Sequence, residues 1–170
     1  LRLLGATALF WIISLFTPKE KVERKDFITI FFAAIFGVCI NMLAFFRGLE
    51  LSTPINSGVI ITLSPVIVLI LSYLFLKEKI TFLKLSGILI GFSGALFLIF
   101  NSSKTGINAP NIPVGNSLFL LNASAYAGYL VIIKPLAKKY NVFTLMKWTF
   151  LFGLILSTPL TISQFNAVEW

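Results

Sequence analysis

Six long apolar runs fill this 170-residue chain, and short charged segments separate them. No charged side chain occurs from Leu51 to Leu76 or from Leu85 to Ser103. A helix of about 20 apolar residues crosses the hydrocarbon core of a bilayer. Hydrophobic residues make up 58% of the chain and charged residues 12%, which leaves too few polar side chains to coat a water-soluble domain. The sequence therefore predicts a membrane protein.

The apolar runs predict six transmembrane helices. Lipid offers the backbone no hydrogen-bonding partner, so each span must pair its own N–H and C=O groups by forming a helix. None of the six runs has the alternating pattern of a membrane β-strand. The predicted spans are Leu3 to Thr17, Phe27 to Phe46, Pro54 to Leu76, Phe82 to Phe100, Val114 to Leu136 and Thr144 to Phe165. The expected fold class is all-α, a polytopic transmembrane helix bundle.

The basic residues predict the orientation of this bundle. When alternate connections are assigned to alternate sides, eleven of the 14 Lys and Arg residues share one side, and Arg2, Arg47 and Lys104 lie opposite. The larger group is predicted to be cytoplasmic by the positive-inside rule. Its members are Lys19, Lys21, Arg24, Lys25, Lys77, Lys79, Lys84, Lys134, Lys138, Lys139 and Lys147. The net charge of +8 is therefore interpreted as membrane orientation, and we expect a lipid bilayer and no nucleic acid as partners.

The first apolar run is shorter than a full span, and the chain begins at Leu1-Arg2 without an initiating Met. No small-residue cleavage site follows this run, so we do not expect a signal peptide. We expect a truncated chain with a further helix before it. The first and last spans both close at Thr-Pro, at Thr17-Pro18 and Thr158-Pro159, while crossing in opposite directions. This pattern is a weak indication of inverted repeats.

The third span contains candidate substrate-binding residues and a candidate hinge. At 100° per residue, Ser57 and Ser64 lie on one face of a helix. Pro65 removes the hydrogen bond that its nitrogen would have donated to Ile61, which predicts a kink. The two hydroxyls then either face a water-filled cavity where a substrate binds, or bond back to their own helix.

The second and fifth spans supply the other candidate substrate-binding residues. Asn122, Tyr126 and Tyr129 stand at i, i+4 and i+7 and so share one face of a helix. An amide beside two phenols suits an amino acid or another small amphipathic metabolite. Asn41 lies on a stripe of small residues that lets a second helix approach closely. The alternative for these side chains is hydrogen bonding between helices or, for Tyr129, a place in an interfacial aromatic belt.

The fourth span has a face of small residues, Gly87, Gly91 and Gly94. Such a face lets another helix approach closely. We therefore predict helix packing there, either within the chain or between two chains of a homodimer.

Enzyme chemistry is not expected. The chain contains no His, and its only cysteine, Cys39, lies within an apolar run, so no metal site is predicted. The six acidic residues lie at or outside predicted helix ends, which leaves no visible proton relay inside the membrane. These residues are Glu20, Glu23, Asp26, Glu50, Glu78 and Glu169. No cofactor is predicted.

The stretch from Gly48 to Phe100 reads GLELSTPINSGVIITLSPVIVLILSYLFLKEKITFLKLSGILIGFSGALFLIF. It resembles the EamA family of the drug/metabolite transporter superfamily. The ordered features that carry the resemblance are Ser64-Pro65, the Glu78 that closes the same helix, and the glycine helix that follows. The run from Gly115 to Tyr140 looks like the opening helix of the second repeat in that family.

The resemblance implies ten helices in two inverted five-helix repeats around a central cavity, with both ends cytoplasmic. This chain would hold helices two to seven. Residues 1–103 would be most of the first repeat, with four helices, and residues 114–170 the start of the second, with two. Because helices one, eight, nine and ten would be absent, we expect no transport by this chain as a monomer.

The resemblance also implies a function. The expected protein is a multi-pass transporter of the plasma membrane, the inner membrane in bacteria. It would export small metabolites, such as amino acids or drug-like compounds, by alternating access.

Two alternatives stay open. One is a nucleotide-sugar or organic-phosphate antiporter, which needs cations inside the bundle, where only Lys134 and Lys147 come close. The other is a non-transporting membrane scaffold subunit that associates through the Gly87 face.

Overall fold

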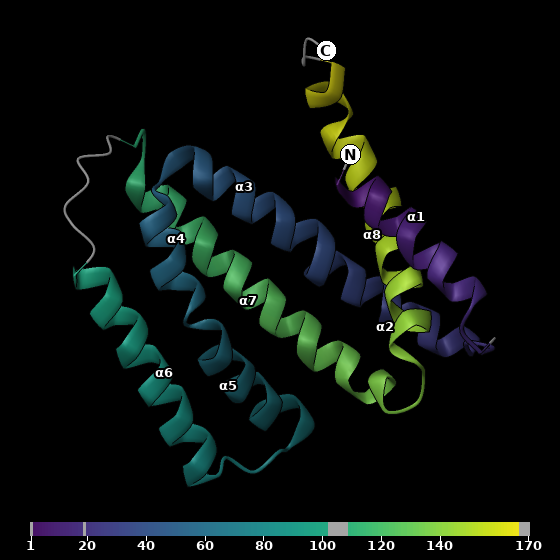
Figure 1. Ribbon diagram of the computed structural model, residues 1–170, viewed down its shortest axis with the longest axis horizontal. Helices are drawn as coiled ribbons and strands as arrows, with labels where there is room; N and C mark the ends of the chain where they lie inside the picture. Colours follow the sequence, from purple (N-terminus) through teal and green to yellow (C-terminus); the bar gives the residue numbers. More distant parts are fainter. Residues whose placement is uncertain (1, 19, 102–108, 167–170) are drawn as a thin grey trace. The chain divides into compact units, whose positions relative to one another are not determined.

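The computed structural model describes residues 2–18, 20–101 and 109–166, and for 94–101 and 160–166 it describes the backbone alone. These residues form helices joined by short connections (Figure 1). The helices are α1 (Arg2–Leu15), α2 (Arg24–Ala34), the π-helix η1 (Ile35–Ile40), α3 (Asn41–Leu51), α4 (Pro54–Ile61), α5 (Ser64–Leu76), α6 (Phe82–Asn101), α7 (Ile112–Ala137) and α8 (Val142–Asn166). The predicted all-α membrane bundle is confirmed.

Four helical stretches among the described residues are long and apolar enough to cross a membrane. They are Arg24–Leu51, Pro54–Leu76, Ile112–Ala137 and Val142–Pro159. The apolar stretches Arg2–Leu15 and Phe82–Ser93 are shorter. The second span is longer than predicted, because α2, η1 and α3 form one continuous helical stretch. The sequence pattern did not predict the π-helical turn in its middle.

The third predicted span is two helices with a break between them. Thr53 caps α4 by accepting a hydrogen bond from the N–H of Asn56, and α4 ends at Ile61. The N–H groups of Thr62 and Leu63 then bond three residues back, at 3.2 and 3.0 Å, which tightens the chain into a turn. The hydroxyl of Thr62 donates to the Val59 carbonyl at 2.5 Å. The break lies just before Ser64 and Pro65, and the proline has no N–H with which to bond back to the Ile61 carbonyl.

Contacts divide the chain into two compact units. Unit 1 comprises Leu1–Cys39 and Ile132–Trp170, and unit 2 comprises Ile40–Val131. The chain passes from unit 1 to unit 2 at the end of η1, and it returns within α7. These units group helices that touch one another, whereas the predicted repeats, 1–103 and 114–170, are defined by topology. The division into repeats stays a prediction.

Unit 1 is held together by aromatic contacts between α8 and the helices α1 and α2. The helices α1 and α8 lie side by side in Figure 1. The rings of Phe10 and Phe150 have their centres 5.0 Å apart, and those of Trp11 and Trp148 are 5.6 Å apart. Phe27 from α2 lies 4.9 Å from Trp148, edge to face. Such edge-to-face pairs add to the energy of packing.

Unit 2 is built on the close approach of α3 and α7, which lie side by side in Figure 1. A Cβ added to Gly48 would lie 2.7 Å from a ring carbon of Phe119, a residue that is fully buried. A Cβ added to Gly115 would lie 2.8 Å from the main-chain nitrogen of Ser52. The helix α3, which begins with Asn41, therefore packs closely against α7 at Gly48, because only glycine leaves room for the facing atoms.

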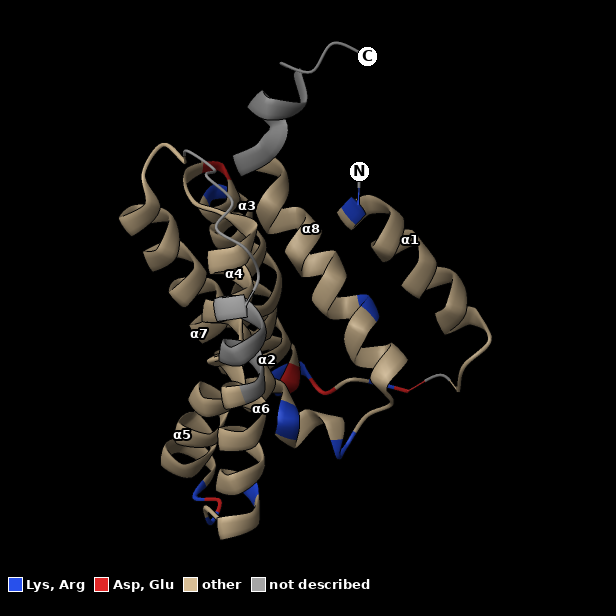
Figure 2. Cartoon of the chain, turned by 60° about the vertical axis from the view of Figure 1, so that its left-hand side comes forward, with Lys and Arg blue, Asp and Glu red and all other residues tan. Residues whose placement is uncertain are grey.

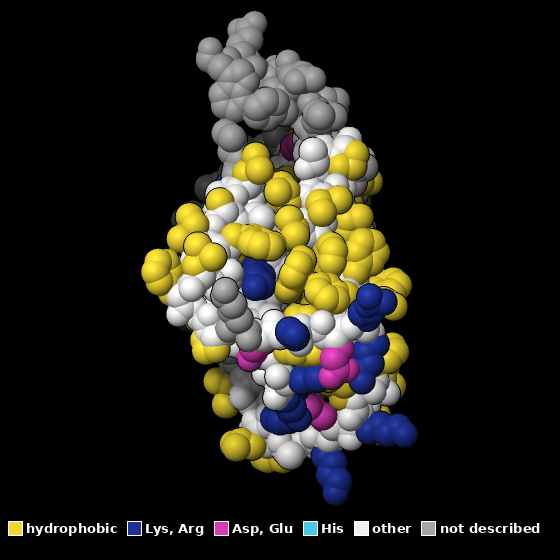
Figure 3. Space-filling model, turned by 90° about the vertical axis from the view of Figure 1, so that its right-hand side faces the viewer, with side chains coloured by type: hydrophobic (Ala, Val, Ile, Leu, Met, Phe, Trp, Pro, Cys, Tyr) yellow, Lys and Arg dark blue, Asp and Glu magenta, His cyan; other side chains and the backbone are white. Residues whose placement is uncertain are grey.

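The burial pattern of both units is the reverse of that in a water-soluble protein. The buried positions are rich in Ala, Ser and Thr, whereas many Leu, Ile and Phe side chains are exposed. On the face drawn in Figure 3, apolar side chains spread over the helices, and charged side chains gather at one end. Small and polar residues inside with large apolar residues outside are typical of helices that face lipid. The chain is a multi-pass membrane protein.

Charged residues lie mainly at the helix ends and connections (Figure 2). Lys147 is the exception in α8, five residues after the helix begins at Val142. Its ammonium group lies 5.6 Å from the ring centre of Trp11 and 5.9 Å from that of Trp148. The two indole rings attract this cation through their electron-rich faces.

Candidate functional site

Two of the predicted site residues, Asn41 and Asn122, meet in unit 2. The Asn122 side-chain amide donates to the Asn41 main-chain carbonyl at 2.8 Å, and the Asn41 amide donates to the Asn122 carbonyl at 3.2 Å. Asn122 is buried, and Asn41 is partly buried. The structure thus shows the interhelical hydrogen bonding that was the alternative to substrate contact. A role in binding substrate stays a proposal for both residues.

The predicted residues Ser57 and Ser64 lie on either side of the helix break. Ser57 is buried in α4, and Ser64 is the buried first residue of α5. Pro65 directly follows Ser64, so the proline, the break and two buried hydroxyls occur within nine residues of chain. A broken membrane helix leaves backbone groups that polar side chains or a bound molecule can satisfy. A hinge motion at Pro65 stays a proposal.

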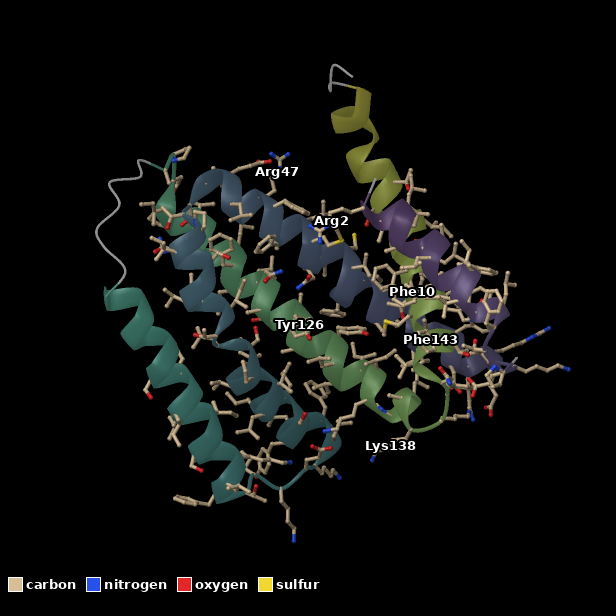
Figure 4. All side chains as sticks on the ribbon, viewed as in Figure 1. Arg2, Phe10, Arg47, Tyr126, Lys138 and Phe143 are labelled. Carbon is tan, nitrogen blue, oxygen red and sulfur yellow. The ribbon has the colours of Figure 1, made fainter. Side chains whose placement is uncertain are left out.

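The predicted pair Tyr126 and Tyr129 lies on α7, where Figure 4 labels Tyr126. Their ring centres are 6.2 Å apart. Tyr126 is 43% exposed, whereas Asn122, one turn earlier, is 6% exposed. The shared face predicted for these residues therefore changes from a helix contact at Asn122 to an open aromatic surface at Tyr126.

At two of its three glycines, the predicted packing face on α6 contacts none of the side chains that the structure describes. A Cβ added to Gly87 or Gly91 would meet no described atom within 4 Å. The surroundings of Gly94 lie outside the described residues. Packing of this face against another chain stays a prediction.

A polar network at one end of the α3–α7 pair was not predicted. The hydroxyl of buried Ser52 donates to the side-chain oxygen of Asn116 at 2.7 Å. The same hydroxyl accepts a hydrogen bond from the side-chain amide of Asn56 at 3.2 Å. Ser52 thus joins the end of α3 to the starts of α4 and α7. The sequence around Ser52 contains no pattern that predicts this network, because Ser52 and Asn116 lie 64 positions apart in the chain.

A charged cluster in unit 1 was also not predicted. The ammonium group of Lys139, in the α7–α8 connection, contacts the carboxylates of Glu23 at 2.6 Å and Asp26 at 2.7 Å. The hydroxyl of Tyr140 donates to Asp26 at 2.7 Å and accepts from the Glu23 N–H at 3.2 Å. The sequence contained a signal for this cluster, since three acidic residues lie among the basic residues of one predicted cytoplasmic connection, and lysines lie in another.

These contacts shift the titration of the two exposed members of the cluster. The hydrogen bonds that the Lys139 ammonium donates to the carboxylates of Asp26 and Glu23 raise its pKa above its usual value of 10.5. Hydrogen bonds from Lys139 and Lys25 lower the pKa of Glu23 below its usual value of 4.5. Each partner favours the charged form of the other, so all of these groups are ionised at neutral pH.

Comparison with known proteins identifies the family. The profile of the EamA-like transporter family matches residues 1–100, more than half of the chain. The chain belongs to the EamA-like transporter family. This match covers α1 to α6 of this EamA-like chain, including the broken helix and the glycine face, although α7 and α8 lie outside it.

Relatives of this EamA-like chain occur in archaea, bacteria and plants. An uncharacterized transporter of Archaeoglobus fulgidus is 33% identical over 155 residues, which are 91% of this chain and 53% of the relative. The uncharacterized transporter YyaM of Bacillus subtilis is 26% identical, over 97% of this chain and 57% of its own length. A WAT1-related protein of Arabidopsis thaliana is 28% identical, over 81% of this chain and 39% of its own length.

The EamA-like chain spans about half the length of the curated relatives that it matches. The names of the family and of these relatives are those of transporters. No solved structure matches the chain.

Proposed function

We propose that this chain forms part of a plasma-membrane transporter that exports small metabolites, such as amino acids or drug-like compounds, by alternating access. Membership of the EamA-like transporter family and the lipid-facing helices support transport across a membrane. Export, the class of cargo and the mechanism are proposed from the arrangement of polar residues in unit 2.

The observation that carries the proposal is the broken helix with buried hydroxyls on both sides of the break. Ser57 and Ser64 are 5% and 8% exposed, inside a stretch that is otherwise strongly apolar. Transporters commonly bind substrate near the membrane midplane, where a discontinuous helix presents backbone and hydroxyl groups. We assign Ser57 and Ser64 to substrate binding on this basis, together with Asn41, Asn122, Tyr126 and Tyr129.

The charges of unit 2 favour uncharged or zwitterionic cargo. Among its described residues, the charged side chains lie toward the ends of α3 and α5 and in the first turns of α6. They are Arg47, Glu50, Lys77, Glu78, Lys79 and Lys84. A phosphate-bearing cargo would need cationic partners within the bundle. Hydroxyls, amides and phenols can bind polar groups without a net charge.

Pro65 would allow the two halves of the broken helix to change their angle during transport. The hydrogen bond missing at a proline permits bending at low cost. Alternating access needs such a place, because the site must open to each side in turn. Ser57 and Ser64 would then move relative to each other as the helix bends.

Transport is tested with the full reading frame that contains this chain, expressed in a strain from which everted membrane vesicles are prepared. Uptake into these vesicles is measured for a panel of radiolabelled amino acids and a fluorescent drug-like cation. Ser57→Ala and Tyr126→Phe are compared with Leu121→Ala, which changes a 48% exposed side chain of α7.

We expect the vesicles to take up at least one compound only when the protein is present. Ser57→Ala and Tyr126→Phe should reduce this uptake, and Leu121→Ala should leave it unchanged. No protein-dependent uptake of any compound by a folded protein would contradict the proposed function and favour a scaffold. Uptake that is insensitive to every site substitution would contradict only the residue assignments.

A further inference from the structure

The charged cluster in unit 1 joins two connections that come from different parts of the chain. One is the segment 20–26, which enters α2, and the other is the segment 138–141, between α7 and α8. We propose that this cluster is a cytoplasmic latch, an ionic contact that closes the cytoplasmic side and opens in each transport cycle. The proposal rests on the proposed function, and it goes beyond it by naming the contact that must break.

The latch has three parallel connections. Lys139 bridges the carboxylates of Glu23 and Asp26, and Tyr140 bonds both to Asp26 and to the Glu23 main chain. The Glu20 carboxylate accepts a hydrogen bond from the Asn141 N–H at 2.8 Å. The residues joined are more than 110 positions apart in sequence. The cluster therefore holds together two segments that the chain itself leaves separate.

The position of the latch relates it to alternating access. Segment 20–26 would belong to the first repeat and segment 138–141 to the second, and both lie on the side that the lysines predict to be cytoplasmic. When inverted repeats rock against each other, contacts between them at one membrane face form and those at the other face break. A contact between the repeats at the cytoplasmic end is therefore a contact that changes with the state of the transporter.

The exposure of the latch makes it reversible. The side chains of Lys139 and Glu23 are 39% and 50% exposed, whereas that of Asp26 is 11% exposed. Water can solvate the exposed pair when it separates, so opening leaves no bare charge in lipid. In the closed state, the buried Asp26 holds Lys139 and Tyr140 in fixed positions, because its carboxylate accepts hydrogen bonds from both side chains.

The helix that carries Asp26 has a place to bend. Nine residues beyond Asp26, α2 becomes the π-helix η1, from Ile35 to Ile40. Single π-helical turns within α-helices occur frequently at functional sites, and they are recognised positions of helix kinks. The unit boundary follows Cys39, at the end of this turn.

The decisive test is to tie the latch closed. Glu20→Cys and Asn141→Cys are combined in the full-length protein, with all other cysteines replaced, and joined by a short, reducible thiol crosslinker. The matched control is Lys138→Cys with Asn141→Cys, which crosslinks within one connection. We expect loss of flux on crosslinking the first pair, recovery after reduction and no loss for the control. Unchanged flux in the fully crosslinked first pair would overturn the latch and leave the proposed function standing.

A second measurement does not depend on transport. Thr144→Cys places a thiol at a position that is 2% exposed, in the first turn of α8 after the latch. Its labelling by a water-soluble maleimide from the cytoplasmic side reports opening. We expect several-fold faster labelling with Asp26→Asn, and slow labelling again in the charge-swapped Asp26→Lys and Lys139→Asp protein.

These readouts separate the two hypotheses. A protein that moves no compound but shows this labelling pattern would contradict the proposed function and keep the latch. A labelling rate that is unchanged by Asp26→Asn would overturn the latch. Faster labelling in both the single variant and the swapped protein, with a lowered melting temperature, would overturn it in favour of a merely structural contact.

Discussion

Asn41 and Asn122 each donate a side-chain hydrogen bond to the main-chain carbonyl of the other, across the contact between α3 and α7. The two residues are 81 positions apart in the sequence. Each side-chain amide donates to a main-chain carbonyl, so changing the side chain of one residue does not remove the acceptor that the other residue uses. The pair therefore fixes the register of the two helices and places Tyr126 one turn beyond the contact, on the open side of α7.

Each bond of this pair can be removed separately. Asn122→Leu abolishes one side-chain donor and leaves the Asn41 amide bonded to the main chain of residue 122. We expect each single change to Leu to cost about 1 kcal/mol of stability, and the double change to cost about twice as much. Thermal unfolding in detergent measures this, with Ser117→Ala as control because that hydroxyl donates to the Pro113 carbonyl of its own helix. A double variant no less stable than either single variant would show that the bonds are not independent.

The glycines of unit 2 should differ sharply in their tolerance of alanine. At Gly115 the added methyl group would meet main-chain atoms, the Ser52 nitrogen at 2.8 Å and the Gly48 oxygen at 3.0 Å, which cannot rotate away. We expect Gly115→Ala to destabilise the protein by about 1–3 kcal/mol. Gly87→Ala meets open space and should be neutral or slightly stabilising, because alanine favours a helix. Melting temperatures of the two variants in the same detergent decide the comparison.

Destabilisation by Gly87→Ala would mean that this face packs against a surface outside the described residues. If the destabilisation by Gly87→Ala depends on the protein concentration, the result would favour the predicted homodimer.

Pro65→Ala should slow transport more than it changes stability. Alanine restores an N–H that can bond to the Ile61 carbonyl, so the break between α4 and α5 can close into a straight helix. We expect a lower rate of vesicle uptake, an unchanged substrate concentration at half-maximal rate and an equal or higher melting temperature. Pro54→Ala is the matched control, because Pro54 stands in the first turn of α4, where a proline interrupts nothing. An uptake rate equal to that of the Pro54 variant would argue against a hinge at Pro65.

The cluster at Lys139 predicts a pH window for stability. The pKa of Glu23 is lower in the folded protein than its usual value of 4.5. Its contribution to the stability of the fold is therefore present above pH 4.5, and it is lost as the pH falls through the lower pKa of the folded state. The pKa of Lys139 is higher in the folded protein than its usual value of 10.5. Its contribution to stability is therefore complete below pH 10.5, and it is lost as the pH rises through the higher pKa of the folded state. We expect a plateau of melting temperature between these limits.

The matched comparison is Lys139→Met, which removes the cation that both carboxylates contact. Its melting temperature should fall below that of the natural protein within the plateau, and the difference should narrow at both extremes of pH. A constant difference across the whole range would show that the side chain stabilises by packing rather than by charge.

The helix positions were largely predictable from the sequence. The predicted spans at Val114 to Leu136 and Thr144 to Phe165 lie within two residues of the ends of α7 and α8. The break near Pro65 was predictable too, because proline lacks the N–H that a helix needs. The π-helical turn in the second span was not, since its residues are as apolar as those around them and η1 differs only in which carbonyl each N–H reaches.

The candidate site was predictable only in part. Pattern alone placed Asn122 and Tyr126 on one helical face, and it left open whether that face meets a helix or a cavity. The structure gives the two residues different surroundings, since α3 covers Asn122 and leaves Tyr126 exposed. The network around Ser52 had no local signal, because its partner Asn116 comes from another helix.

The sequence by itself determined that this chain is a helical membrane protein, and where its helices run. The reason is that lipid forces each apolar segment to satisfy its own backbone, so local composition decides local structure. The tertiary structure alone decided which polar groups meet, as Asn41 does with Asn122 and Lys139 with Asp26. Those pairings depend on which helices become neighbours and in what register, and no short stretch of sequence contains that information.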